Sequence, residues 1–78
     1  MAIVYTKHAQ EMLKYRRIKQ ELADECAINP DYTLPEEENY KIYLKDYGKN
    51  YLKLVVSEEE KHKVIITVHW LDKKRVKK

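Results

Sequence analysis

Residues 40–71 read YKIYLKDYGKNYLKLVVSEEEKHKVIITVHWL, and this stretch decides the fold. Three runs in it are rich in β-branched and aromatic residues and predict strands at residues 40–47, 51–56 and 64–71. Gly48 predicts a tight turn between the first two runs, because glycine adopts positive φ without steric cost. The charged residues 58–63 predict the second turn. Strands joined by such short connections form an antiparallel meander.

The N-terminal part of the chain has a different pattern. Its first 29 residues contain neither glycine nor proline. Thr6 is a candidate N-cap, and apolar residues then recur at helical spacing through residues 7–17 and 19–28. This periodicity fits either one long helix or two shorter ones. Asn29-Pro30 ends the helical run, since a residue that precedes proline avoids helical geometry.

Short apolar runs at residues 3–5 and 32–34 predict two further strands. The resulting order is β-α-α-β-β-β-β, which predicts an α+β domain over residues 1–72 and a basic C-terminal tail at residues 73–78. One or two N-terminal helices then pack on one face of a small antiparallel sheet. Because two helices at most can cover only one face, the other face is left for solvent or a ligand.

Alternation along the strands assigns their side chains to the two faces. The predicted core face consists of Tyr40, Ile42, Leu44, Leu52, Leu54, Val56, Val64, Ile66, Val68 and Trp70. The predicted open face consists of Lys41, Tyr43, Lys45, Tyr51, Lys53, Val55, Lys63, Ile65, Thr67 and His69. Such a surface suits single-stranded nucleic acid, because lysines hold phosphates and tyrosine rings stack on bases. The alternatives are an ordinary polar sheet surface or, given Val55 and Ile65, a surface that a second copy or a peptide covers.

Charge and cysteine content bound the class of protein. The net charge is +3, but the tail carries five of the 16 basic residues, so the other 72 residues hold 11 basic and 13 acidic side chains. A basic tail attracts polyanions, although it is also typical of a solvated terminus. The single cysteine, Cys26, fits a reducing cytoplasm, and no apolar run approaches the roughly 20 residues that span a membrane. Richness in lysine and glutamate is typical of thermophile proteins.

Three histidines, His8, His62 and His69, are the candidate groups for acid–base chemistry near neutral pH. Cleavage of RNA through its 2′-hydroxyl needs a base, an acid and a cation that stabilises the phosphorane. His69, Tyr43 or Tyr47, Lys53 and Arg16 or Arg17 supply those groups if they converge, and His8 lies in the first turn of a helix, where anions bind. We predict no metal site and no cofactor, because the histidines are far apart and Gly48 is the single glycine.

The chain also resembles a known family, over Tyr5 to about Lys74. The matching residues are His8-Ala9, Met12, Arg16, Ile18, Asn29-Pro30, Leu54-Val55-Val56 and Ile66-Thr67-Val68. They resemble the uncharacterised-domain family numbered 4258, a domain of unknown function grouped with the RelE/BrnT-like toxin superfamily. The resemblance implies a RelE-like fold and an mRNA-cleaving toxin that an antitoxin holds in check. BrnT-like proteins carry arginines near the end of the sheet, where this chain has Thr67-Val68-His69-Trp70.

These inferences together predict a toxin-like endoribonuclease of a toxin–antitoxin system, or an inactive relative of one. The alternative is a non-catalytic module that binds nucleic acid or protein. The predicted catalytic residues are His8, Arg16, Lys53 and His69. The predicted RNA-binding residues are Lys41, Tyr43, Lys45, Tyr51, Lys73, Lys74 and Arg75. The expected partners are RNA or the ribosome, an antitoxin protein and a second copy of the chain, with no membrane.

Overall fold

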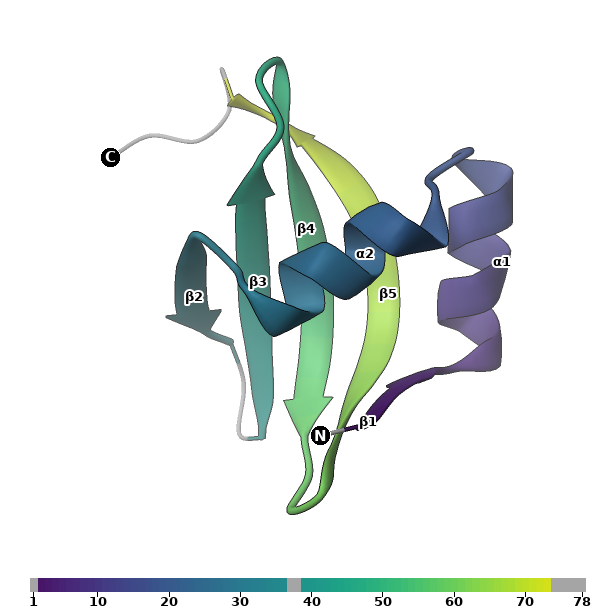
Figure 1. The fold of residues 1–78 in the computed structure, drawn as a ribbon, viewed down its shortest axis with the longest axis vertical. Helices are drawn as coiled ribbons and strands as arrows, with labels where there is room; N and C mark the ends of the chain where they lie inside the picture. The colour runs from purple at the N-terminus through teal and green to yellow at the C-terminus, as the bar shows by residue number, and fades with distance from the viewer. Residues whose placement is uncertain (1, 37–38, 74–78) are drawn as a thin grey trace.

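Two helices pack against a five-stranded sheet in the computed structural model, which describes residues 2–36 and 39–73 (Figure 1). The predicted α+β class is confirmed, and so is the chain order β-α-α-β-β-β-β. The helices are α1 (Lys7–Tyr15) and α2 (Gln20–Ile28). The strands are β1 (Ala2–Tyr5), β2 (Tyr32–Pro35), β3 (Tyr40–Asp46), β4 (Asn50–Glu58) and β5 (His62–Asp72). No helix in this part of the chain is long and apolar enough to cross a membrane.

The strands lie in the order β1-β5-β4-β3-β2. The antiparallel meander predicted for β3 to β5 is present, and β2 adds to it antiparallel to β3. However, β1 pairs with β5 in parallel, with Ala2 opposite His62 and Tyr5 opposite Ile65. The prediction of a purely antiparallel sheet was therefore wrong, and the sheet is mixed. The reason is that β4 occupies one edge of β5 and leaves the other edge open for the N-terminal strand.

Thr6 joins β1 to α1 and fixes this helix to β5. Its hydroxyl accepts a hydrogen bond from the Ala9 N–H at 3.0 Å, as predicted for an N-cap, and donates one to the Ile66 carbonyl at 3.2 Å. The Thr6 N–H donates to the Ile65 carbonyl at 3.1 Å, which extends the sheet ladder by one residue. The N-terminus of α1 is thus attached to the middle of β5, and the helix lies alongside that strand.

A break at Arg17 separates the helical segment into two helices, which settles the alternative left open by periodicity. Arg17 has a φ of 55°, in the left-handed region. Its N–H donates to the Lys14 carbonyl at 3.3 Å, and the Ile18 N–H donates to the Leu13 carbonyl at 2.8 Å. This pair of bonds is the Schellman motif, in which glycine usually takes the left-handed position. Leu13 and Ile18 are both buried in the core, so packing offsets the cost of arginine there.

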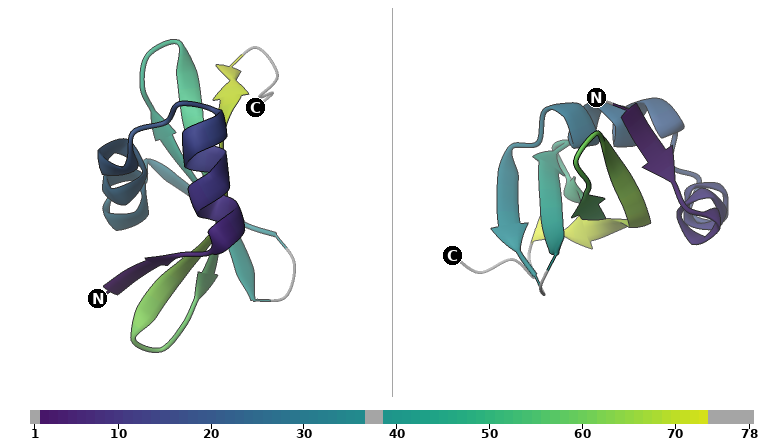
Figure 2. Two further views of the ribbon diagram at one scale, coloured as in Figure 1. Left: turned by 90° about the vertical axis from the view of Figure 1, so that its right-hand side faces the viewer. Right: turned by 90° about the horizontal axis from the view of Figure 1, so that it is seen from below.

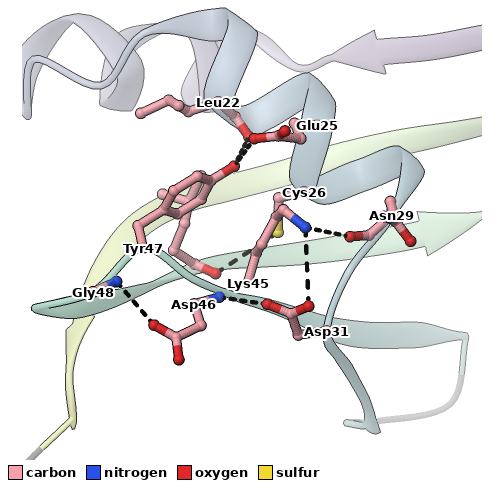
Figure 3. A network of polar contacts seen from close by, with 10 residues as sticks. Leu22, Glu25, Cys26, Asn29, Asp31, Lys45, Asp46, Tyr47 and Gly48 are labelled. Carbon is pink, nitrogen blue, oxygen red and sulfur yellow. Dashed lines mark hydrogen bonds and ion pairs between the residues drawn. The ribbon is translucent and has the colours of Figure 1, made fainter.

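A polar network holds α2 and the residues that follow it to β3 and to the turn after β3 (Figure 3). The Lys45 ammonium donates to the Asn29 carbonyl at 2.9 Å and lies 3.9 Å from the Asp31 carboxylate. The Tyr47 hydroxyl bonds to the Leu22 carbonyl at 3.1 Å and to the Glu25 carboxylate at 2.6 Å. A cation at the end of a helix also interacts favourably with the helix dipole. These contacts fix α2 across β3 and β4.

The helix-covered face of β3 is the opposite of the one predicted. Tyr43 pairs with Leu54, which pairs with Val68, and these three side chains form part of one core cluster with α1 and α2. Tyr43 is only 2% exposed. Tyr40, Ile42 and Leu44, predicted as core, therefore point away from the helices, although Leu44 is buried as predicted, outside the cluster that the helices cover. The reversal is possible because the Tyr43 ring fills the core while its hydroxyl reaches the Glu58 carboxylate, so that burial leaves no polar group unpaired.

A β-bulge between Val55 and Val56 changes the faces of β5. Val68 and Trp70 lie on the helix side as predicted, but beyond the bulge Ile65 is the core residue. The prediction that Val64 and Ile66 lie in the core, with Lys63 and Ile65 on the open face, is wrong, because one extra residue in β5 shifts the alternation. Figure 2 shows α2 over one face, α1 beside β5, and no helix of the described chain over the opposite face, hereafter called the uncovered face.

Candidate functional site

Lys53 and His69 lie opposite each other on the uncovered face. The register pairs Lys53 of β4 with His69 of β5. Their neighbours Leu54 and Val68 point into the core, so alternation directs Lys53 and His69 to the other side of the sheet. This placement is as predicted from the sequence. It depends on the β4–β5 hairpin, which fixes the register of the two strands.

Arg16 joins this pair from the end of α1. It is the C-cap of the helix that lies alongside β5, and its charge acts on His69. The left-handed turn at Arg17 ends the helix immediately after it. Three of the four predicted catalytic residues, Arg16, Lys53 and His69, therefore come from three different elements, and the charges of the first two both act on the third. We refer to them as the His69 cluster.

The electrostatics of the cluster favour neutral imidazole. Burial is the main cause that lowers the pKa of His69 from its ordinary value of 6.5, and the positive charges of Lys53 and Arg16 lower it further. His69 is half-buried. An imidazole with a lowered pKa is unprotonated at neutral pH, so it can accept a proton.

Both cations of the cluster are available to an anion. Within residues 2–36 and 39–73, neither Lys53 nor Arg16 forms an ion pair. Two positive side chains beside a neutral imidazole, on a face that no helix covers, make a site that attracts a negatively charged group. The arrangement can bind a phosphate and hold a proton acceptor next to it.

His8 does not belong to the cluster. It is exposed in the first turn of α1, whereas Arg16 caps the other end of that helix. Eight residues at 1.5 Å rise place the two about 12 Å apart along the axis. His8, predicted as a catalytic residue from its place in the first turn of a helix, therefore lies apart from the other three candidates, because the N-terminus of α1 is bonded to β5 at Ile65 and Ile66.

The predicted RNA-binding lysines and tyrosine of β3 lie on the helix side. Lys41 forms an ion pair with Glu58 at 3.0 Å, Tyr43 is in the core, and Lys45 caps α2. The prediction that Lys41, Tyr43 and Lys45 lie on the open face was wrong, because β3 turns the side that carries Tyr43 toward the helices.

Tyr51 does lie on the uncovered face, but it is not free to stack on a base. Its side chain is 8% exposed, its ring packs edge-to-face on Tyr32 at 5.9 Å, and the Lys73 ammonium lies 5.2 Å above it. Lys73 also forms an ion pair with Asp46 at 2.6 Å. Lys74 and Arg75, predicted to contact RNA, lie outside the described residues.

The accessible aromatic rings on the uncovered face are ones that the sequence did not single out. Tyr32 is 48% exposed and Tyr40 is 43% exposed. The register places Tyr32, Leu44, Lys53 and His69 in one row across four strands. Alternation along β3 places Tyr40 on the uncovered face once Tyr43 is assigned to the core. Tyr32 could not be found in this way, because nothing in the sequence fixes the pairing of its short strand, β2.

No metal centre is evident in the part of the chain that the structure describes, where no group of three or more His, Cys, Asp or Glu side chains gathers. Cys26 is buried on α2, its thiol donates weakly to the Leu52 carbonyl at 3.7 Å, and burial raises its pKa to about 12. A thiol with so high a pKa is a poor nucleophile at neutral pH. The His69 cluster is therefore the candidate site that the described residues offer.

Comparison with known proteins gives a family but no functional relative. No curated protein and no solved structure matches the chain. One family model matches residues 5–70, a range that includes both helices and all three residues of the His69 cluster. The chain therefore belongs to the family described as "Domain of unknown function (DUF4258)".

Proposed function

We propose that this chain is a toxin-like, metal-independent endoribonuclease with a RelE-like fold, which cleaves RNA on the uncovered face of the sheet. The observation that carries the proposal is the position of His69 opposite Lys53, with the charges of Lys53 and Arg16 both acting on it and neither cation ion-paired within residues 2–36 and 39–73. The placement of both helices to leave one face of a meander bare supports the RelE-like assignment. Since a fold hosts many functions, the chemistry of the cluster is the stronger support.

The proposed reaction is attack of the RNA 2′-hydroxyl on the adjacent phosphorus. His69, neutral because its pKa is lowered, takes the proton of the 2′-hydroxyl as the new O–P bond forms. Lys53 and Arg16 donate hydrogen bonds to the non-bridging oxygens, where negative charge accumulates. The bond to the 5′-oxygen breaks, and that oxygen takes a proton from Lys53 or from solvent. The products are a 2′,3′-cyclic phosphate and a 5′-hydroxyl.

The test is cleavage of single-stranded RNA by the purified full chain, with and without ribosomes. We expect His69→Ala to reduce the rate by about 100-fold or more, because general-base catalysis contributes roughly 10²–10⁴. Lys53→Ala should also slow cleavage, by removal of a charge-stabilising donor. The matched controls are His62→Ala and Lys49→Ala, outside the cluster, which should cleave at the wild-type rate. Absence of cleavage by wild type under both conditions would contradict the proposal.

The toxin assignment has its own test in cells. Induced expression of the wild-type chain should arrest growth, and His69→Ala should not. A partner protein encoded beside the gene should restore growth and co-purify with the chain. Growth arrest that persists unchanged in His69→Ala would argue against a nuclease origin of the toxicity.

The exposed rings of Tyr32 and Tyr40 favour a second candidate, a module that binds RNA without cleaving it. Stacking on an aromatic side chain contributes roughly 1–3 kcal/mol per base. In that case Tyr32→Ala should weaken binding of single-stranded RNA about fivefold or more. His69→Gln should bind RNA as wild type does, and neither His69→Gln nor wild type should cleave it. Binding in both proteins, with cleavage in wild type alone, favours the nuclease.

A further inference from the structure

A separate pocket of about 300 Å³ opens on the helix side of the sheet. It is lined by Ile3 of β1, Ala27 and Ile28 of α2, and Lys63 of β5. Lys63 lies six residues before His69 on β5, roughly 20 Å away along the strand, and on the opposite face. The pocket is therefore independent of the His69 cluster and of the function proposed for it.

Lys63 supplies the pocket with a cation whose charge is only partly offset. Its ammonium donates to the Ala27 carbonyl at 2.9 Å and lies 4.9 Å from the centre of the Tyr43 ring. Within residues 2–36 and 39–73 no carboxylate lies at ion-pair distance from it. Glu58 is influenced by Lys63, but its carboxylate is bound by Tyr43 and Lys41. An ammonium has three N–H donors. With one on the Ala27 carbonyl and one toward the Tyr43 ring, one remains for a ligand as far as the described residues are concerned.

The other lining residues are apolar. Ile28 is 70% exposed at the last position of α2, and Ile3 is partly buried against the core. A volume near 300 Å³ is at the low end for ligand sites, which are mostly apolar with a few polar groups that orient the ligand. A cation without an ion-pair partner in residues 2–36 and 39–73, in a pocket that two isoleucines also line, matches a small molecule with an anionic head and a hydrocarbon body.

We propose that this pocket binds a small organic carboxylate with a short hydrocarbon chain. The carboxylate pairs with the Lys63 ammonium, and the chain lies against Ile3 and Ile28. The ammonium is preorganised for this role, because the Ala27 carbonyl and the Tyr43 ring hold it in place. A neutral or cationic ligand of the same length lacks the ion pair.

The experiment is an NMR titration of the full chain with hexanoate, hexan-1-ol and hexylamine. We expect saturable shifts at the backbone amides of Ile3, Ala27 and Ile28 with hexanoate, and at least tenfold weaker binding of the alcohol and the amine. Lys63→Met keeps most of the side-chain stem but removes the charge, and should weaken hexanoate binding at least tenfold. Lys61→Met is the matched control, an exposed lysine with the same change in net charge, and should bind hexanoate as wild type does.

Two results would overturn the proposal: no shift with hexanoate, or equal binding of all three probes. Should Lys63→Met fail to fold, Ile28→Asp decides, since this side chain is largely exposed and the substitution leaves the core intact. A carboxylate at the mouth of the pocket repels hexanoate, so affinity should fall at least tenfold. Unchanged affinity in Ile28→Asp would overturn the proposal as well.

Discussion

Lys53 and His69 occupy opposing positions on β4 and β5, so an ammonium group lies beside a half-buried imidazole on the uncovered face. Burial is the largest cause of the lowered pKa of His69, and the charge of Lys53 is the next. The cation at Arg16 adds a smaller effect of the same sign. The pKa of His69 is therefore sensitive to the presence of Lys53 and Arg16.

The first prediction concerns this coupling. Lys53→Met should raise the pKa of His69, because a neighbouring positive charge that disfavours imidazolium is removed. The value should stay below 6.5, since burial remains. Arg16→Met should raise it less than Lys53→Met. The pKa is measured by NMR titration of the imidazole protons, with Lys49→Met as the control. An unchanged His69 pKa in Lys53→Met would show that the two side chains do not interact.

The second prediction concerns stability against pH. The pKa of His69 is lowered in the folded state, so the unfolded chain binds the proton more readily. The free energy of unfolding is therefore highest, as far as His69 is concerned, above about pH 6.5. It falls as the pH drops below 6.5, because the unfolded chain takes up the proton first, and it stops falling below the pKa of the folded state. Thermal unfolding midpoints at pH 7.5 and 5.5 should therefore differ more in wild type than in His69→Gln. His8 and His62 are present in both proteins, so their effect on the unfolding midpoint cancels in the comparison. An equal shift of the midpoint between the two pH values in wild type and in His69→Gln would contradict the prediction.

Most of the fold could be predicted from the sequence because its signals are local. Alternation with a turn at Gly48 gave the hairpin of β3 and β4, and Asn29-Pro30 marked the end of α2. The parallel pairing of β1 with β5 has no local signal, because it joins residues about 60 positions apart. The break at Arg17 was also hidden, since arginine rarely takes a left-handed conformation.

The faces of the sheet could be predicted only where one side of a strand was clearly apolar. Lys53 and His69 were placed correctly because Leu54 and Val68 are unambiguous core residues. On β3 both faces carry a tyrosine, so alternation could not decide between Ile42 and Tyr43. In β5 the run Val64-Ile65-Ile66 is apolar on both sides, so the bulge left no mark in the sequence. The approach of Arg16 to His69 depends on the helix break and could not be derived.

The third prediction concerns that helix break. Arg17→Gly should stabilise the protein by roughly 1 kcal/mol, because a left-handed conformation costs an L-residue about 1–2 kcal/mol, whereas glycine adopts it freely but loses some chain entropy. Lys14→Gly, inside α1, is the matched control and should destabilise by about 1 kcal/mol. Urea unfolding at equilibrium measures both. Destabilisation by Arg17→Gly would show that the arginine side chain makes a contact worth more than the backbone cost.

The last prediction tests the reversed face of β3. Tyr43 lies in the core with Leu54 and Val68, so Tyr43→Ala should destabilise the protein by about 3–5 kcal/mol, as for other large buried aromatics. Tyr40→Ala, on the uncovered face and 43% exposed, should cost about 1 kcal/mol or less. Tyr43→Phe keeps the ring and loses the bond to Glu58, so it should cost about 1 kcal/mol. The free energy of unfolding from urea titrations checks all three. A larger cost for Tyr40→Ala than for Tyr43→Ala would restore the original assignment of faces and return Tyr43 to the candidate RNA surface.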